Sequence, residues 1–566
     1  MHLLDWFVLA STLALIVLYG VWKSRNSVGD SADFLAGKRD LPWWTIGLSI
    51  MATQASAVTF LSTPGQAYAD GMQFIQFYFG LPIAMVFLAY FVLPIYYKLR
   101  VTTAYEFLEQ RFDLRIRSLT AILFLIQRGM AASISILAPS IILCAVFGWN
   151  LALTNFFMAV FVVFYTVSGG SAAVSRTQEL QMTVALSGLV LAFILIMYNL
   201  PDGVGVSEAW QIAGAGGKTK IIDWDFSWTD RYNVWSGVLG ATFLFLSYFG
   251  TDQSQVGRYL SGKTLRESRI GLLFNGLIKI PMQFLVLAVG VMVWVFFQFN
   301  QPPLHFNQAN LLMLKGTPQE ATYQKLEADD SQLFSQKAAV LEGLTQAQLS
   351  KNELQINARM ADLQSLEQRR TELRTQAATL ISEVNPSADT KDKDYIFINF
   401  VLDHIPKGLV GLILAMIFSA SWSTTASELS ALAATSVSDI YRRSLVTGRS
   451  DAHYLRASKW AVVLWGIFIV LFAIFAALSE NLIQAVNMIG SLFYGTILGV
   501  FFTAFFLKSV GAKAVFAGAI VSEIVVLIMF FGVSKDAYLW YNPLGCGIVM
   551  GLGWLIQHSF FRGEKQ

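Results

Sequence analysis

Residues 43–65 read WWTIGLSIMATQASAVTFLSTPG, and this stretch decides the fold. Aromatic and aliphatic residues begin it, but its middle carries alanine, serine, threonine and glutamine, which is too polar for a helix that faces lipid. Small and hydroxylated residues ahead of Pro64 and Gly65 predict a helix that unwinds inside a membrane. An unwound stretch exposes backbone carbonyl oxygens, which are natural ligands for a hard cation such as Na⁺ near the bilayer midplane.

The composition of the whole chain predicts the same environment. Of 566 residues, 55% are hydrophobic and 14% are charged, and the mean hydropathy is +0.54. These values exclude a soluble protein and indicate an all-α polytopic membrane protein. The net charge of +3 gives no reason to expect nucleic acid as a partner. Cys144 and Cys546 lie in apolar stretches, which argues against a disulfide framework or a zinc site. No histidine lies beside a plausible nucleophile, so we expect no enzyme.

Thirteen apolar stretches are long enough to cross about 30 Å of hydrocarbon. They lie near residues 3–22, 42–66, 75–98, 116–147, 150–168, 174–200, 235–258, 270–299, 406–437, 455–480, 483–508, 511–533 and 538–560. The first has no basic segment before it and no small-residue cleavage site after it, so we interpret it as a retained helix rather than a signal peptide.

Charge predicts the orientation of these helices, because lysine and arginine are held on the cytoplasmic side of short loops. Basic residues gather in loops near 23–39, 98–117, 258–269 and 442–459, and the alternate short loops hold few. We therefore expect a multi-pass protein of the cell (inner or plasma) membrane. Its amino terminus would be extracytoplasmic and its carboxyl terminus cytoplasmic, which requires an odd number of helices.

One long polar segment, near 301–405, interrupts the apolar pattern. Leu363, Leu366, Leu373, Ala377 and Leu380 keep a three-four spacing within it, which predicts helices. We divide the chain into helices 1–8 (1–315), an extracytoplasmic helical hairpin inserted at 316–395, and helices 9–13 (396–566). Two interpretations stay open: a solvated insertion with no role in the function of the membrane part, or a docking site or substrate-capturing cap.

The ninth apolar stretch offers a partner for residues 43–65. Ala420, Ser423, Thr424 and Ser427 share one face of a helix, so that hydroxyls and a carbonyl could converge on a cation. Alternatively, this stripe of small residues serves close helix packing. Glu428 lies beside this face, either satisfied by hydroxyls and cytoplasmic water or acting in cation coupling.

Five motifs, in this order along the chain, resemble the sodium:solute symporter family. They are residues 52–56, residues 105–112 (YEFLEQRF), residues 165–170 (YTVSGG), residues 253–260 (QSQVGRYL), and Ala420-x-x-Ser423-Thr424 followed by SDIY at 438–441. The resemblance covers nearly the whole chain outside 316–395. It implies the inverted-repeat fold typified by the leucine transporter, with five-helix repeats beginning at the second and seventh helices and about 13 helices in total.

The resemblance also implies where sodium binds. The family's principal sodium site would use the carbonyls of Ala52, Ala55 and Ala420 and the hydroxyls of Ser423 and Thr424. Some members bind a second sodium through an aspartate, whose position here is occupied by Gln178. We therefore expect one sodium ion per cycle as the coupling ion, unless Glu179 or Glu428 substitutes. The candidates for a second cation are Gln178, Glu179, Ser427 and Glu428.

The candidate solute contacts are Gln54, Ser56, Thr59, Arg128, Phe245 and Tyr248. Sugar-transporting members use a glutamine and an asparagine at the positions of Thr59 and Phe245, so hexose is disfavoured. Ser56 and Thr59 match hydroxyls that sialic-acid-transporting members use, and residues 96–102 are similar to the monocarboxylate, iodide and vitamin branch.

Arg128 lies about 16 Å along its helix from Arg117, which places it near the midplane. A guanidinium there binds either an anion bidentately or the carbonyls of neighbouring helices. Sialic-acid carriers place their arginine one turn later, level with Ala131. We expect Na⁺-coupled symport of a small organic carboxylate by a chain that works as a monomer in the bilayer. The alternative is a neutral solute such as a sugar, polyol or amino acid.

Overall fold

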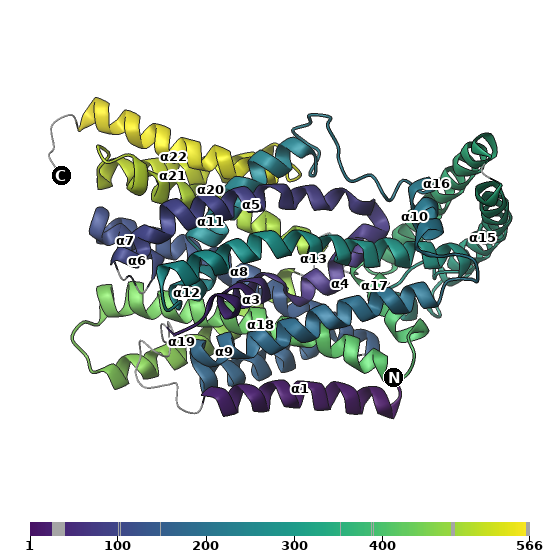
Figure 1. Ribbon diagram of the computed structural model, residues 1–566, viewed down its shortest axis with the longest axis horizontal. Helices are drawn as coiled ribbons and strands as arrows, with labels where there is room; N and C mark the ends of the chain where they lie inside the picture. The colour runs from purple at the N-terminus through teal and green to yellow at the C-terminus, as the bar shows by residue number, and fades with distance from the viewer. Residues whose placement is uncertain are drawn as a thin grey trace.

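The computed structural model describes residues 1–24, 40–99, 101, 103–147, 149–350, 352–386, 388, 390–476 and 481–561. Residues 25–39 and Arg100, which contribute to the basic loops used to predict orientation, lie outside these ranges. Helices pack side by side along the long axis of the molecule (Figure 1). The amino terminus lies at the end that carries a long helical hairpin, and the last helix ends at the opposite end.

The first half of the membrane part contains the first eight predicted stretches. Its elements are α1 (Leu3–Ser24), α3 (Trp43–Gln54), α4 (Ala57–Asp70), the 3₁₀-helix η1 (Gly71–Phe79), α5 (Gly80–Phe87), the π-helix η2 (Leu88–Val92), α6 (Leu93–Leu99), α7 (Ala104–Arg111), α8 (Leu114–Phe147), α9 (Leu151–Tyr198), α10 (Val206–Ala215), the π-helix η3 (Ser236–Gly240), α11 (Ala241–Gly250), α12 (Gln253–Leu260) and α13 (Leu265–Phe299).

The second half follows the hairpin. Its elements are α17 (Lys393–His404), α18 (Leu409–Thr435), the π-helix η4 (Ser436–Leu445), α19 (Asp451–Ala476), α20 (Leu482–Phe506), α21 (Ala512–Gly532) and α22 (Tyr538–Phe560). Helix α18 is the centre of the packing, because every residue from Met416 to Thr435 is buried and the helix contacts α1, α3, α8, α9 and α19.

Each of the thirteen predicted stretches coincides with helix in the part of the chain that the structure describes, and residues 477–480 of the tenth stretch lie outside that part. Within the described ranges, nine helices are long and apolar enough to cross a membrane, and three shorter apolar helices accompany them. The stretches predicted at 150–168 and 174–200 both lie in α9, as the apolar segments Leu151–Val167 and Thr177–Tyr198. The helical membrane architecture is therefore confirmed, whereas the count of thirteen spans is not established.

The predicted unwinding of residues 43–65 occurs at Ala55 and Ser56, between α3 and α4. The Ala55 N–H still donates to Met51, but Ser56 adopts an extended conformation and starts a new helix. Pro64 lies within α4 rather than at the break. There it packs closely on α13, where a Cβ on Gly290 would meet the Pro64 oxygen at 2.1 Å.

A second membrane helix is also broken, which the sequence did not lead us to predict. Helix α11 ends at Gly250 and α12 begins at Gln253, with Thr251 and Asp252 between them. The Asp252 carboxylate caps α12 by accepting the Ser254 N–H, the usual arrangement at a helix start. The two breaks lie in the second and seventh predicted helices, the first helix of each predicted five-helix repeat.

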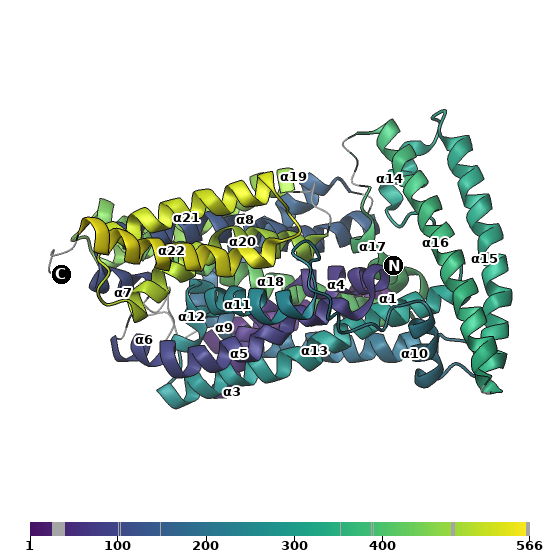
Figure 2. The ribbon, with the colours of Figure 1, turned by 90° about the horizontal axis from the view of Figure 1, so that it is seen from above.

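The polar segment forms α14 (Gln308–Leu314) and the hairpin of α15 (Glu320–Leu349) and α16 (Glu353–Val384). The hairpin lies across the end of the membrane bundle (Figure 2). Both of its helices contact the rest of the protein. On α16, Gln364 donates to the Ala215 carbonyl at 3.1 Å and Arg370 donates to the Pro303 carbonyl at 3.3 Å, and on α15 the Ser331 hydroxyl accepts from Gln301 at 2.7 Å.

Candidate functional site

Three of the five predicted cation ligands meet where the α3–α4 break faces α18. The Thr424 hydroxyl lies 3.1 Å from the Ala52 carbonyl oxygen, and the Ser423 hydroxyl lies 3.4 Å from the same oxygen. Ala55 lies at the break itself, and Ala420 lies one turn before Thr424 on α18, both buried. Among the described residues no group of three His, Cys, Asp or Glu side chains could hold a metal ion. The site therefore offers neutral oxygens, which suit a monovalent ion that must be released.

Gln178 of α9 fills the place predicted for a second cation. Its amide nitrogen donates to the Ser427 hydroxyl at 2.7 Å and to the Thr53 hydroxyl at 3.1 Å. Its amide oxygen accepts from Ser49. The amide nitrogen thus engages the oxygens of α3 and α18 that a cation would use. Glu179 points elsewhere on α3 and accepts the hydroxyl hydrogen bond of Thr45.

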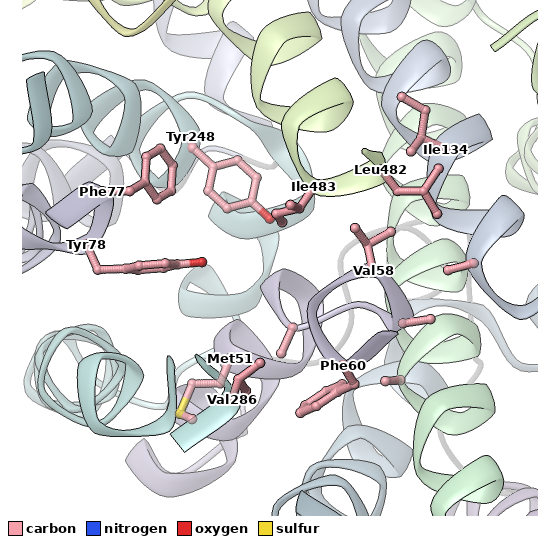
Figure 3. Close-up of a cluster of buried hydrophobic side chains, with 14 of the residues drawn as sticks. Met51, Val58, Phe60, Phe77, Tyr78, Ile134, Tyr248, Val286, Leu482 and Ile483 are labelled. Carbon is pink, nitrogen blue, oxygen red and sulfur yellow. The ribbon is translucent and has the colours of Figure 1, made fainter. Parts of the chain in front are cut away.

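All six predicted solute contacts line one cavity of about 70 Å³. They are Gln54, Ser56, Thr59, Arg128, Phe245 and Tyr248. Thr424 and Glu428 also line it, so the cavity adjoins the cation site directly. Figure 3 shows the rings of Phe77, Tyr78 and Tyr248 on one side and Val58 on the other, and all four residues line this cavity.

Arg128 lies in this cavity wall between two buried carboxylates. Its Nη1 donates to Glu428 Oε1 at 3.1 Å, and its Nη2 forms an ion pair with Asp252. The same Nη2 donates to the Tyr494 hydroxyl at 2.9 Å, and the guanidinium lies 5.2 Å from the centre of the Tyr248 ring. The guanidinium therefore binds neighbouring carboxylates rather than helix carbonyls. Its Nε and the Glu428 Oε2 are buried without a hydrogen-bond partner among the described residues.

Several residues of the cavity region were missed at the sequence level. Asp252 pairs with Arg128, while Tyr494 and Asn487 of α20 line the cavity. Lys279 of α13 is fully buried, and its Nζ has no hydrogen-bond partner in the described part of the chain. This Nζ lies 5.8 Å from the ring centre of Tyr78, which lines the cavity. Asp252 and Lys279 are charged residues within predicted membrane helices, a signal that marks functional positions.

Comparison with known proteins points to one family. A family model described as the sodium:solute symporter family matches residues 34–303 and 377–522, and leaves out 304–376. The sodium/sialic acid symporter SiaT of Proteus mirabilis (strain HI4320) is 26% identical over 572 residues, which cover 100% of this chain and 96% of SiaT. Sodium-coupled monocarboxylate transporter 1 of Xenopus laevis is 27% identical over 516 residues, covering 90% of this chain and 69% of that protein.

A solved structure has the same fold. It is the substrate-bound outward-open state of a Na⁺-coupled sialic acid symporter, which superimposes with a TM-score of 0.75 at 24% sequence identity. The match covers 99% of this chain and 98% of that chain.

Proposed function

The chain belongs to the sodium:solute symporter family, and from that premise we propose that it moves a small organic carboxylate across the membrane together with one Na⁺. Membership makes the protein a sodium-coupled membrane transporter rather than an enzyme, with Na⁺ as the coupling ion.

One observation carries the proposed sodium site: the convergence of the Ser423 and Thr424 hydroxyls on the Ala52 carbonyl. Na⁺ would bind the carbonyls of Ala52 and Ala55 from α3, and Ala420, Ser423 and Thr424 from α18. Because its ligands come from two elements, the ion stabilises only the state in which α3 and α18 are close. Moving α3 away from α18 separates the ligands and releases the ion, which is how binding would couple to alternating access.

Gln178 supports a stoichiometry of one sodium. A second cation between α3, α9 and α18 would have to displace the Gln178 amide nitrogen from Ser427 and Thr53. Gln178 is neutral, so it supplies no negative charge to offset the ion. Glu428, whose Oε1 is paired with Arg128, would supply its second oxygen only on the cavity side.

The carboxylate class is supported by the relatives and by the cations of the cavity region. Sialic acid and monocarboxylates, named for two relatives, are organic acids. Arg128 lines the cavity, and Lys279 is a buried lysine whose Nζ lies 5.8 Å from the ring centre of Tyr78 without a hydrogen-bond partner among the described residues. A carboxylate that reached it would supply the counter-charge that favours its protonated form. A substrate carboxylate would reach Lys279 past Tyr78 or share Arg128 with Glu428.

A neutral solute is the second candidate, and the pairing of Arg128 favours it. Two buried carboxylates already bind the guanidinium, so the carboxylates outnumber the single positive charge even without a substrate anion. A neutral solute would instead use amides and hydroxyls of the cavity, such as Gln54, Thr59 and Asn487.

Uptake into proteoliposomes separates the two candidates. We would supply labelled sialic acid, propionate, a hexose and a neutral amino acid, with and without an inward Na⁺ gradient, at zero and at inside-negative potential. One Na⁺ with a monoanion is electroneutral, so potential should change its uptake little. One Na⁺ with a neutral solute moves one charge, worth about 2.3 kcal/mol per 100 mV. Sodium-driven uptake of only neutral solutes, accelerated by potential, would contradict the carboxylate proposal.

We also propose that the protein works as a monomer in the cell membrane, with its amino terminus and hairpin extracytoplasmic and its carboxyl terminus cytoplasmic. The distribution of basic loops supports this orientation. Labelling of single cysteines with a membrane-impermeant maleimide tests it, after Cys144 and Cys546 have been replaced. Cysteine at Glu353, an exposed residue of the hairpin, should react in intact cells, and cysteine at Arg449 should react only after lysis.

A further inference from the structure

A second hollow, of about 520 Å³, lies between the hairpin and the end of the membrane bundle. Helix α16 contributes Glu367, Arg370 and Arg374 to its wall, the end of α4 contributes Tyr68 and Asp70, and residues 390–393 lie on another side. The family model leaves out residues 304–376, which include Glu367, Arg370 and Arg374.

The wall of this hollow carries more positive than negative charge. Five lysine and arginine side chains line it, against three carboxylates. The cations are Lys218, Arg370, Arg374, Lys391 and Lys393, and the carboxylates are Asp70, Glu367 and Asp392. Two charged residues that do not line the hollow contact residues that do: Asp330 forms an ion pair with Arg370, and Lys337 forms one with Glu367. Asp330 and Lys337 have opposite charges, so together they do not change the count. Burial lowers the pKa of His305, which leaves that ring neutral. The residues that line the hollow thus include two more cations than carboxylates.

One hydrogen-bond donor of the wall, on Arg374, has no partner among the described residues. Arg374 Nη2 binds Asp392 at 2.6 Å, while its Nη1 is buried without a hydrogen-bond partner among the described residues. Arg370 fixes α16 against the membrane part through the Tyr68 hydroxyl, at 3.4 Å. Helix α16 of the hairpin, on one side of the hollow, is therefore hydrogen-bonded to α4 of the membrane part, on the other side.

The hollow lies in line with the solute cavity along two helices. On α20, Gln484 lines the hollow and Asn487 lines the cavity, and three residues of helix correspond to about 4.5 Å. On α4, Tyr68 lines the hollow and Thr59 lines the cavity. On α4, Ser62 lies between Thr59 and Tyr68 in the sequence; its hydroxyl lies 2.6 Å from Oδ1 of Asn481, which lines the hollow, and also bonds Asp394, so that α4, α17 and the start of α20 are joined there.

We propose that this hollow is an outer anion-binding site, roofed by the inserted hairpin, which captures the organic carboxylate before it passes the Ser62–Asp394–Asn481 contact into the solute cavity. The site rests on the proposed carboxylate transport. Its excess positive charge raises the local concentration of an anion and speeds its arrival, an effect that added salt weakens. The ligand is a monovalent organic acid, held by the free Arg374 donor and by the surrounding field rather than by a sodium ion.

The experiment compares charge-neutralised variants in the full-length protein. Arg374→Gln and Lys391→Gln each remove one positive charge from the wall, and Arg369→Gln removes one from the neighbouring exposed position of α16. We would measure Na⁺-driven uptake of labelled sialic acid or propionate, whichever the wild type carries, over a range of substrate concentrations. Choline chloride would raise the ionic strength at constant Na⁺.

We expect KM to rise about threefold to tenfold in both lining variants, with the maximal rate unchanged and the salt dependence reduced. Arg369→Gln should behave as the wild type. An unchanged KM and an unchanged salt dependence in both lining variants would overturn the outer site while leaving the proposed function intact. A wild type that carries neither acid would contradict the proposed function, and the outer site with it. Lys391 lies outside the hairpin helices. If Arg374→Gln does not fold, the KM and salt dependence of Lys391→Gln still test the outer site.

Discussion

The two broken helices occupy equivalent places in the predicted repeats, yet their chemistry differs. The α3–α4 break at Ala55 and Ser56 contains no charged side chain, and its neighbours on α18 are hydroxyls. The α11–α12 break contains Asp252, whose carboxylate caps α12 and pairs with Arg128. The uncharged break leaves carbonyl oxygens that can bind an ion reversibly. The charged break is held by a buried ion pair that links α8, α12 and α18.

Removing Arg128 should have the largest effect. Arg128→Ala leaves Asp252 and Glu428 as buried carboxylates without their counter-charge, which costs about 3–5 kcal/mol of stability. We expect a strongly lowered unfolding temperature in detergent and loss of uptake. Adding Glu428→Gln to Arg128→Ala should recover part of the stability, because it removes one of the two charges. A single variant as stable as the wild type would contradict the network.

Loss of a hydroxyl that faces the uncharged α3–α4 break should have the second-largest effect. Thr424→Ala removes one proposed sodium ligand, and a lost interaction of about 1–2 kcal/mol corresponds to a roughly fivefold to thirtyfold higher half-saturating Na⁺ concentration for uptake. Ser423→Ala should act in the same direction. Ser419→Ala is the matched control, because among the described residues this buried hydroxyl on α18 donates only to the Met416 carbonyl of its own helix. Equal sodium dependence in Thr424→Ala and Ser419→Ala would show that the hydroxyl is no ligand.

A carboxylate at position 178 should place a negative charge beside the α3–α4 break, as Asp252 does at the α11–α12 break. Gln178→Asp replaces an amide that donates to Ser427 and Thr53 with a carboxylate able to hold a cation there. We expect the Hill coefficient for Na⁺ in uptake to rise from about 1 towards 2. Gln178→Met, which removes the amide without adding charge, should keep a coefficient near 1. An unchanged coefficient in an active Gln178→Asp protein would argue against this region as a latent cation site.

The smallest effect is expected at the cap of the charged break. Ser254→Ala removes the hydroxyl that donates to Asp252 Oδ1 at 2.6 Å, while the Ser254 N–H still donates to the same oxygen at 2.9 Å. We expect a loss of about 1 kcal/mol in thermal unfolding measurements, with sodium dependence unchanged. A loss as large as that of Arg128→Ala would mean that capping, and not the ion pair, holds this break.

The sequence predicted those features that depend on local pattern. The apolar stretches are helices, because a span must satisfy its backbone hydrogen bonds internally in lipid. The first break was predicted because small polar residues gather there, whereas Thr251 and Asp252 interrupt an apolar run too briefly to indicate a second. The depth of Arg128 followed from helix rise. Its partners did not, because Asp252 and Glu428 lie 124 and 300 residues away along the chain.

The same limit applies to the solute region and the hairpin. All six predicted contacts line one cavity, although they were found by different signals. Gln54 and Ser56 lie in the motif at 52–56, whereas Arg128 was singled out by its depth in the membrane. The contributions of α20, such as Tyr494 and Asn487, were missed because nothing local distinguishes them from packing residues. The leucine spacing predicted paired helices at 316–395, but the contact of Arg370 with Tyr68 joins residues 302 apart and only the fold brings them together.

Sodium binding to the purified protein, without any substrate, tests the uncharged break most directly. Equilibrium binding of ²²Na⁺ would be measured for the wild type, Thr424→Ala and Ser419→Ala. We predict one saturable ion per chain in the wild type and in Ser419→Ala, and binding weakened roughly fivefold or more in Thr424→Ala. Wild-type affinity in Thr424→Ala, or two ions per chain in the wild type, would contradict the account of a single sodium held between α3 and α18.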